Sequence, residues 1–148
     1  MLLQQQTIIK APLEDVFAFF SAPENLARLT PRSLGFRIIS APHRPLRKGD
    51  RITYRIRIAG IPVRWVTLIT DWVPNDSFTD TQEKGPYEKW VHSHRFAKVA
   101  EGVLMEDRVD YELPFGKLGK VAGGGFVRWQ LRRIFDFRTR VIRSIFET

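Results

Sequence analysis

Cysteine is absent from the 148 residues of the chain. Its absence excludes a disulfide framework and a nucleophilic thiol, and it fits a reducing compartment. Long apolar runs are absent as well, since the longest near the start, Val16 to Phe20, is far too short to span a bilayer. Residues 1–10 lack the basic and apolar regions of a secretory signal. Together these absences predict a soluble, cytoplasmic protein.

The chain also lacks the signature motifs of several enzyme classes. It contains no G-x-S-x-G sequence, the nucleophile motif of α/β-hydrolases. Gly123 to Gly125 precede a predicted helix, but without the Gly-Lys-Ser/Thr of a phosphate-binding loop or the spacing of a dinucleotide fingerprint. We expect these glycines and residues 114–119 to form a mobile flap, with Phe115 and Leu118 facing an incoming ligand. An ordinary flexible connection is the alternative.

What is present suffices for one folded domain over residues 1–148. Hydrophobic residues make up 43% and aromatic residues 12% of the chain, a composition that argues against disorder. The net charge of +8 is uneven, because residues 1–74 and 114–148 each carry +6 while residues 75–113 carry −4. A nucleic-acid protein or a domain that meets anionic lipid shows such a pattern, and so does an ordinary solvated surface.

Turn residues divide the chain into strands between two helical regions. Leu13, Val16, Phe17 and Phe20 have the spacing of an amphipathic helix, and a second short helical turn begins at Pro23. After an opening strand at about 3–10, strand-like segments follow at residues 34–40, 51–59, 62–72, 77–84, 87–99 and 103–113. Their short connections predict an antiparallel meander. A long amphipathic helix is predicted over residues 124–146.

Two neighbouring predicted strands combine aromatic with polar side chains on one face. Residues two apart share a face of a strand. The members of this face are Trp90, His92, His94 and Phe96 on one strand, with Phe78, Asp80 and Gln82 on the strand before it. Their mixture is too polar for an ordinary core and too apolar for a surface. It therefore predicts the wall of a pocket.

One arginine interrupts the apolar stripe of the long C-terminal helix. Steps of 100° per residue place on this stripe Val127, Leu131, Ile134, Val141, Ile142 and Ile145. Arg138 falls near the middle of the stripe. A buried guanidinium stays charged and needs an anionic partner, for which Asp80 and Asp107 are candidates. A structural ion pair, or a side chain that reaches out to solvent, is the alternative.

Short motifs that run in order along the chain resemble a known superfamily. They include Ile9-Lys10-Ala11-Pro12, Pro23-Glu24-Asn25-Leu26, Trp72-Val73-Pro74, Gly85-Pro86-Tyr87, His92-Ser93-His94-Arg95-Phe96, Leu113-Pro114-Phe115-Gly116 and Ile134-Phe135-Asp136-Phe137-Arg138. This ordered set resembles the helix-grip (SRPBCC) superfamily, which includes START lipid-transfer domains, birch-pollen-type allergens and polyketide cyclase/dehydrase-like proteins. Within it, the chain is most similar to small single-domain members of bacterial type.

The resemblance implies an α+β helix-grip fold. In that fold a curved seven-stranded antiparallel sheet wraps around a long C-terminal helix, with two short helices after the first strand. It also implies a ligand cavity between the sheet and the C-terminal helix. It does not imply one activity, because the superfamily contains carriers, sensors and enzymes.

The favoured interpretation is binding or transport of a hydrophobic small molecule of lipid-, polyketide- or isoprenoid-like chemistry. A ligand with an apolar body and one polar or anionic head fits the predicted pocket, and neither a metal nor a cofactor is expected. The residues predicted to bind the ligand are Trp65, Thr67, Phe78, Asp80, Gln82, Trp90, His92, His94, Phe96, Met105, Asp107, Tyr111, Phe115, Leu131, Ile134 and Arg138.

Alternatives to a carrier stay open at this point. An enzyme of the cyclase or dehydratase type would use His92 or His94 as acid or base, and Asp107 is a further catalytic candidate. The spacing of His92 and His94 also suits two metal ligands, but two neutral histidines paired with neighbouring polar groups are favoured. A basic interaction module for RNA or a protein partner is the third class.

Five arginines are predicted on the outer face of the long helix. They are Arg128, Arg132, Arg133, Arg140 and Arg143. Beside an anionic membrane they would support transient docking of a lipid carrier, and the alternative is a solvated helix face. A nucleic-acid surface is disfavoured, because no predicted strand alternates exposed aromatic with basic residues, as a stacking platform does. The oligomeric state stays open.

Overall fold

Seven strands pair in one antiparallel sheet in the computed structural model, which describes residues 1–147. The strands are β1 (Leu2–Ile9), β2 (Arg37–Ser40), β3 (Arg51–Ile58), β4 (Ile61–Val73), β5 (Ser77–Lys84), β6 (Lys89–Val99) and β7 (Gly102–Glu112). Their spatial order is β1-β7-β6-β5-β4-β3-β2, so the first strand pairs with the last. Short turns join β3 through β7, as the predicted meander requires.

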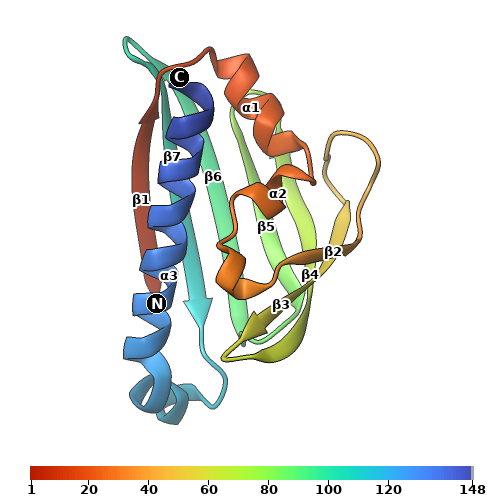
Figure 1. Cartoon of the computed structure of the whole chain (residues 1–148), viewed down its shortest axis with the longest axis vertical. Helices are drawn as coiled ribbons and strands as arrows, with labels where there is room; N and C mark the ends of the chain where they lie inside the picture. The colour runs from red at the N-terminus through yellow and green to blue at the C-terminus, as the bar shows by residue number, and fades with distance from the viewer. Residues whose placement is uncertain (148) are drawn as a thin grey trace.

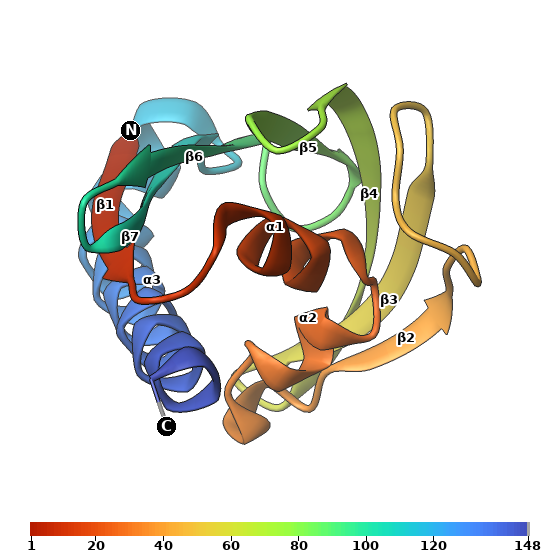
Figure 2. The same ribbon diagram turned by 90° about the horizontal axis from the view of Figure 1, so that it is seen from above.

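The helices lie on the concave side of this sheet. They are α1 (Leu13–Ser21), α2 (Asn25–Arg28), the 3-10 helix η1 (Arg32–Leu34) and α3 (Gly116–Phe146). Figure 2 shows the sheet curving around α1 and α2, with α3 beside the β1–β7 edge. The same arrangement appears in Figure 1, where α3 runs lengthwise along β1 and β7. The predicted fold, with its curved sheet, long C-terminal helix and two short helices, is confirmed.

Helix α1 fills one end of the concave face with apolar side chains. Its acidic residues Glu14 and Asp15 lie in the first turn, where they interact favourably with the helix dipole. Buried Phe17 meets Phe96 of β6 edge-on, with ring centroids 5.3 Å apart. The cluster around these rings extends to Ile142 of α3. This end of the molecule is therefore an ordinary core.

Side chains on β6 and β7 alternate between the concave face and the outer face as predicted. The buried members on β6 and β7 are Trp90, His92, His94, Phe96, Val103, Met105, Asp107, Val109 and Tyr111. Their neighbours in sequence are partly or fully exposed. Because the two strands pair residue by residue, His94 lies opposite Asp107 in the ladder. The register alone thus brings an imidazole next to a carboxylate.

Helix α3 is longer than the sequence predicts. It begins at Gly116 rather than at residue 124, so the predicted flap of residues 114–119 and Gly123–Gly125 is wrong over most of its length. Each glycine costs only about 1 kcal/mol in a helix relative to alanine, and the residues between them are mainly good helix formers. Gly119 is required where it stands, because a Cβ there would overlap the carbonyl oxygen of Pro114. Phe115 and Leu118 face solvent, with 84% and 74% of their surface exposed.

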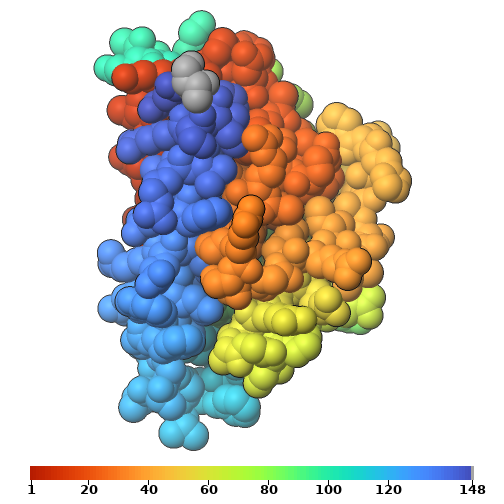
Figure 3. Space-filling view, viewed as in Figure 1, coloured from red at the N-terminus to blue at the C-terminus, as the bar shows by residue number. Residues whose placement is uncertain are grey.

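The predicted strand at 34–40 is also shorter in the structure. It begins at Arg37, because residues 32–34 form η1 and Gly35 adopts a positive φ of 54° that ends this turn. The segment from α2 to η1 instead crosses the open side of the sheet. In Figure 3 this orange segment packs between α3 and the yellow β3–β4 turn.

The buried stripe of α3 contains the arginine that the sequence pattern singled out. Its side chains are Leu131, Phe135, Arg138 and Ile142, at steps of four, three and four residues. Phe135 is the member that the helical projection left out. Arg128, Arg132, Arg133, Arg140 and Arg143 are all exposed, as predicted. Within residues 1–147, no helix has both the length and the apolar composition that crossing a bilayer demands.

Candidate functional site

A cavity of about 170 Å³ lies between the sheet, α3 and the segment from α1 to η1. It exists because α1 fills only one end of the concave face. Aromatic and aliphatic side chains form most of its wall, among them Tyr54, Ile56, Trp65, Trp90, Leu131 and Phe135. Polar side chains gather in one part of the wall, where β5, β6 and α3 contribute Asp80, His92, His94 and Arg138. The cavity thus has an apolar body and a polar region.

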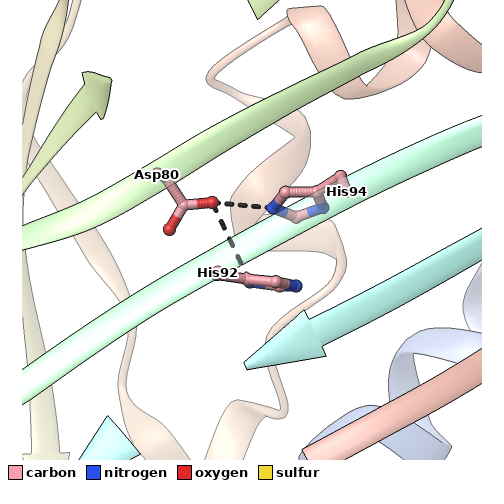
Figure 4. Close-up of side chains that lie close together, drawn as sticks. All are labelled: Asp80, His92 and His94. Atoms are coloured by element: carbon pink, nitrogen blue, oxygen red, sulfur yellow. Dashed lines mark hydrogen bonds and ion pairs between the residues drawn. The ribbon is translucent and has the colours of Figure 1, made fainter. Parts of the chain in front are cut away.

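Two histidines and two aspartates form a connected network in this polar region. Nε2 of His94 lies 2.7 Å from Oδ2 of Asp80, and Nε2 of His92 lies 2.8 Å from Oδ1 of Asp107. The remaining nitrogens face the other acid: Nδ1 of His92 is 3.8 Å from Asp80, and Nδ1 of His94 is 3.3 Å from Asp107. Figure 4 shows Asp80 reaching both imidazoles from β5. Each aspartate therefore serves both rings.

Aromatic contacts hold the two imidazoles in place. Their rings stack on each other with centroids 3.7 Å apart, and the other face of His94 lies 4.0 Å from the ring of Phe78. The edge of His92 meets Phe135 of α3 at 5.5 Å. Rings packed in this way have little freedom to rotate. The hydrogen-bonding directions of both histidines are consequently fixed by the fold.

The guanidinium of Arg138 completes the polar region from the helix side. Its Nη2 is 3.7 Å from Oδ1 of Asp107, close enough for charge attraction but too long for a hydrogen bond. Its Cζ lies 5.1 Å from the centre of the Phe135 ring, a cation–π distance. Nε and Nη2 are buried without any hydrogen-bond acceptor among residues 1–147. Arg138 is therefore the least satisfied group of the site.

The network shifts the pKa of each of its titratable members. Burial opposes the charge of both aspartates, but the facing imidazoles more than offset it, so the pKa of Asp107 lies well below its usual value and that of Asp80 is lowered. Burial and the neighbouring His94 lower the pKa of His92. Burial also opposes the charge of His94, but its contacts with Asp107 and Asp80 raise its pKa overall. His94 is thus the imidazole that holds a proton first.

Three residues of this network also have the spacing of metal ligands. Asp80, His92 and His94 offer ligand atoms within 4.8 Å of one another, the one such group in the part of the chain that the structure describes. Two imidazoles and a carboxylate suit zinc chemically. However, Nε2 of His94 already pairs with Asp80 at 2.7 Å, and the nearby Arg138 guanidinium opposes a divalent cation. The arrangement fits a hydrogen-bonding network better than a coordination shell.

Ten of the sixteen residues predicted to bind the ligand line the cavity. They are Trp65, Thr67, Phe78, Asp80, Trp90, His92, His94, Leu131, Ile134 and Arg138. Their approach to one cavity from β4, β5, β6 and α3 follows from strand alternation and from the helical stripe. That they contact a ligand stays a prediction.

The other six do not line the cavity. Asp107 lies behind the histidines that it binds, and Gln82 is engaged by the backbone of Tyr87 at 2.7 and 3.1 Å. Phe96 and Met105 belong to the core beneath α1. The two remaining residues are Tyr111, buried in the cluster around Trp90, and Phe115, which faces solvent. The strand residues among the six are covered by other parts of the fold or bound by neighbouring groups, whereas Phe115 lies outside the sheet.

Sequence reasoning missed the part of the cavity wall that β3 and the loops around α2 and η1 form. Phe36, Tyr54 and Leu29 line the cavity from β3 and from the loops around α2 and η1. The ring of Tyr54 stacks on Trp65 at 5.7 Å and on Phe36 at 4.8 Å, and burial raises the pKa of the Tyr54 hydroxyl. The two-residue period of Ile52, Tyr54 and Ile56 was a usable signal. The loop residues carry no such period, because their path is irregular.

Solved structures of other proteins share the fold of this chain. The chain is similar in structure to a protein from Chromobacterium violaceum, with 13% identity and a TM-score of 0.77 over 100% of this chain and 99% of that one. Major latex-like protein 151 of Panax ginseng shows 18% identity and a TM-score of 0.70 over 99% and 97%. A protein from Thermus thermophilus shows 16% identity and a TM-score of 0.67 over 97% and 92%. At these identities the likeness shows the fold alone.

At the level of sequence, no curated protein matches the chain. A family model does: the model described as polyketide cyclase/dehydrase and lipid transport matches residues 2–147. That range includes every strand and helix, together with the whole cavity wall. The chain therefore belongs to the polyketide cyclase/dehydrase and lipid transport family.

Proposed function

We propose that the protein binds and carries a hydrophobic small molecule of lipid-, polyketide- or isoprenoid-like chemistry in this cavity. Family membership supports binding of hydrophobic ligands in general. The observation that carries the proposal is the contrast within the cavity wall, where aromatic rings surround one polar region that contains His92, His94 and Arg138. Pockets of this kind bury an apolar body and orient it with a few polar groups.

The hydrogen-bonding of the histidines supports a carrier over an enzyme. A general base needs a free nitrogen within hydrogen-bond reach of the proton that it removes. Each imidazole nitrogen of His92 and His94 instead has a carboxylate oxygen within 3.8 Å. Their packing against Phe78 and Phe135 opposes rotation toward a substrate. The network therefore fixes the orientation of both histidines and keeps their nitrogens paired with the two aspartates.

A cyclase or dehydratase is the second candidate function. It is favoured by one observation, namely that buried histidine–aspartate pairs stand at the wall of an apolar cavity. In that case His92 or His94 would exchange a proton with the substrate and Asp107 would hold the charged imidazole.

Ligand extraction tests the carrier proposal directly. Organic extraction of protein purified from cells, followed by mass spectrometry, should release an apolar compound in near-stoichiometric amount. The emptied protein should then bind the neutral probe N-phenyl-1-naphthylamine and increase its fluorescence. Protein that yields no compound and does not bind the probe would rule out the proposal.

Incubation of the extracted compound with fresh protein separates the two candidates. A carrier should return the compound unchanged, and the His94→Gln variant should bind it more weakly. A product that wild-type protein forms, and that both His92→Gln and His94→Gln proteins fail to form, would instead favour the enzyme.

We also propose that the carrier docks transiently on an anionic membrane through α3. The exposed arginines of its outer face are Arg128, Arg132, Arg133, Arg140 and Arg143. No acidic residue occurs between positions 113 and 135. A second copy of the chain would bring like charges together at this surface, whereas anionic lipid headgroups would neutralise them.

Exposed apolar side chains accompany these charges on the first half of α3. Leu118 is 74% exposed, and Phe126 and Trp129 are each 54% exposed. The guanidinium of Arg133 lies 4.9 Å from the ring of Trp129. In Figure 1 the first turns of α3 extend past the end of the sheet, where they are accessible to a flat surface. Basic and aromatic side chains together suit the interface between headgroups and acyl chains.

A further inference from the structure

We infer that the ligand is a compact monocarboxylic acid whose carboxylate pairs with the guanidinium of Arg138. This inference rests on the proposed function, because it names the chemical class of the molecule in the same cavity. It is carried by the polar atoms of the site that the protein leaves without partners.

Every buried side-chain atom that lacks a hydrogen-bond partner within residues 1–147 is a nitrogen. Four of these five atoms belong to cavity-lining residues: Nε1 of Trp65, Nδ1 of His94, and Nε and Nη2 of Arg138. The indole and guanidinium nitrogens only donate hydrogen bonds. Nδ1 of His94 faces Oδ1 of Asp107 at 3.3 Å, so the donors that still need an acceptor are those of Trp65 and Arg138. The missing group is therefore an acceptor.

The guanidinium of Arg138 specifies which acceptor fits. It is about nine-tenths buried, stays charged, and donates no hydrogen bond to any residue that the structure describes. Asp107 at 3.7 Å offsets part of its charge without accepting a hydrogen bond. Nε and Nη2 share one edge of the guanidinium, and that edge matches the two oxygens of a carboxylate. A single carbonyl oxygen would leave one of the two donors unsatisfied.

The charges around the guanidinium limit the head to one negative charge. Asp80 and Asp107 contribute two carboxylates to the network, while Arg138 and protonated His94 contribute two positive charges. A phosphate or other dianion would be repelled by two carboxylates a few ångströms away. A monocarboxylate carries half that charge and keeps the bidentate geometry.

The size of the cavity limits the body of the ligand. A cavity of about 150 Å³ lined by apolar residues is known to hold one benzene molecule, and this one measures about 170 Å³. Its wall includes Tyr54, Trp65 and Trp90, whose rings suit an aromatic or cyclic body. The class that fits is an aryl or short alicyclic acid with its ring among these side chains.

Three matched compounds test the inference on the emptied protein. They are 4-phenylbutyrate, 4-phenylbutanol and methyl 4-phenylbutyrate, each used to displace N-phenyl-1-naphthylamine at about pH 6, below the ordinary histidine pKa of about 6.5. The carboxylate should bind roughly 10- to 100-fold more tightly than the alcohol or the ester, the range for hydrogen bonds to charged groups. Arg138→Met should remove this preference and leave alcohol binding within about threefold, because the apolar contacts persist.

Two further variants guard against loss of folding. Arg138→Lys keeps the positive charge and the approximate length but lacks the fork, so it should retain only part of the preference. Arg140→Met removes an exposed arginine two positions away on the same helix and should leave the affinities for all three compounds unchanged. Thermal melting of each variant shows that the native fold is present.

Each outcome bears on one proposal. Equal affinity for the acid and the alcohol would overturn the carboxylate assignment while leaving the carrier proposal intact. So would a preference for the acid that survives in Arg138→Met, or failure of all three compounds to displace a bound probe. Protein that yields no compound on extraction and binds neither the probe nor any of the three compounds contradicts the proposed function itself.

Discussion

The imidazoles of His92 and His94 lie face to face, with centroids 3.7 Å apart and planes 29° apart. Two positive charges at this distance repel each other strongly in a buried site. The surrounding aspartates favour a proton on His94, whereas burial and His94 disfavour one on His92. The pair therefore favours the state in which His94 is charged and His92 is neutral.

This arrangement predicts that the pair stabilises the fold most near pH 6.5. The folded-state pKa of His94 is raised above its ordinary value of 6.5, so its stabilisation is full below pH 6.5 and is lost as the pH rises through the raised pKa. The pKa of His92 is lowered from 6.5, so its contribution is full above pH 6.5 and declines as the pH falls. Urea unfolding measured from about pH 5 to 9 checks both limbs.

The His94→Gln variant supplies the control for the alkaline limb. It should flatten the loss of stability above pH 6.5, the ordinary histidine value, while the acidic limb changes less. A wild-type free energy of unfolding that kept rising through this alkaline range would contradict the assigned proton on His94.

Asp107 should matter far more to stability than its exposed neighbour on β7. Asp107→Asn removes a buried charge that faces both histidines and Arg138, and we expect a loss of about 3–5 kcal/mol in the free energy of unfolding. Asp110→Asn breaks only the exposed pair with Lys89 and should have almost no effect. Equal losses for the two variants, measured in urea, would mean that the network does not stabilise the fold.

Filling the cavity should block the ligand without unfolding the protein. Ile56 lines the cavity, so the larger ring of Ile56→Phe has space to enter. We expect at least about a tenfold weaker affinity for N-phenyl-1-naphthylamine and a change in stability of less than about 1.5 kcal/mol.

The matched control is Ile9→Phe, because Ile9 is fully buried in the core beneath α1. There the added volume meets close packing and should cost about 1–3 kcal/mol, with little direct effect on binding. If Ile9→Phe were the better tolerated variant, the open space would have been assigned to the wrong end of the sheet.

Membrane docking should require both the charge and the rings of α3. The wild-type protein should co-sediment with vesicles of phosphatidylcholine and phosphatidylglycerol, whereas it should not co-sediment with vesicles of pure phosphatidylcholine. Arg132→Glu with Arg133→Glu should weaken binding by at least about tenfold, since each basic residue near the surface contributes about 1 kcal/mol. Phe126→Ser with Trp129→Ser should weaken it through lost apolar contact.

Ile39→Ser provides the comparison for the aromatic pair. Ile39 is 52% exposed on β2, at the sheet edge opposite the β1–β7 edge beside which α3 lies, and its replacement should leave vesicle binding unchanged. If the charge-reversed protein bound anionic vesicles as well as the wild type, the docking proposal would fail.

Much of the fold could be predicted because its signals are local. Alternation along β6 and β7 indicates which side chains face inward, and turn residues mark where each strand ends. The position of Arg138 on the apolar stripe of α3 follows from helical spacing alone. The join between η1 and β2 was not predictable, because a left-handed residue at Gly35 ends the turn.

The cavity could be predicted only in part, because alternation does not show which element covers each part of a face. Phe96 shares a face with Trp90 and His92, but Trp90 and Phe96 are separated by about 20 Å of strand, and α1 covers the Phe96 end. The wall contributed by Phe36 and Leu29 depends on the path of an irregular segment. Such contacts are set by tertiary packing, which no local pattern records.

Helix α3 has two parts that differ in stability, because its buried side chains begin only at Leu131. Residues 116–123 place no fully buried side chain against the sheet, whereas Leu131 and Phe135 are sealed into it. Local opening costs little where little apolar surface is lost, so the first turns can unwind and re-form while the part of α3 that lines the cavity stays in place. Amide hydrogens in residues 116–123 should exchange with solvent long before those beyond Leu131. The protein thus combines a rigid cavity wall with a helix end that can adapt its conformation.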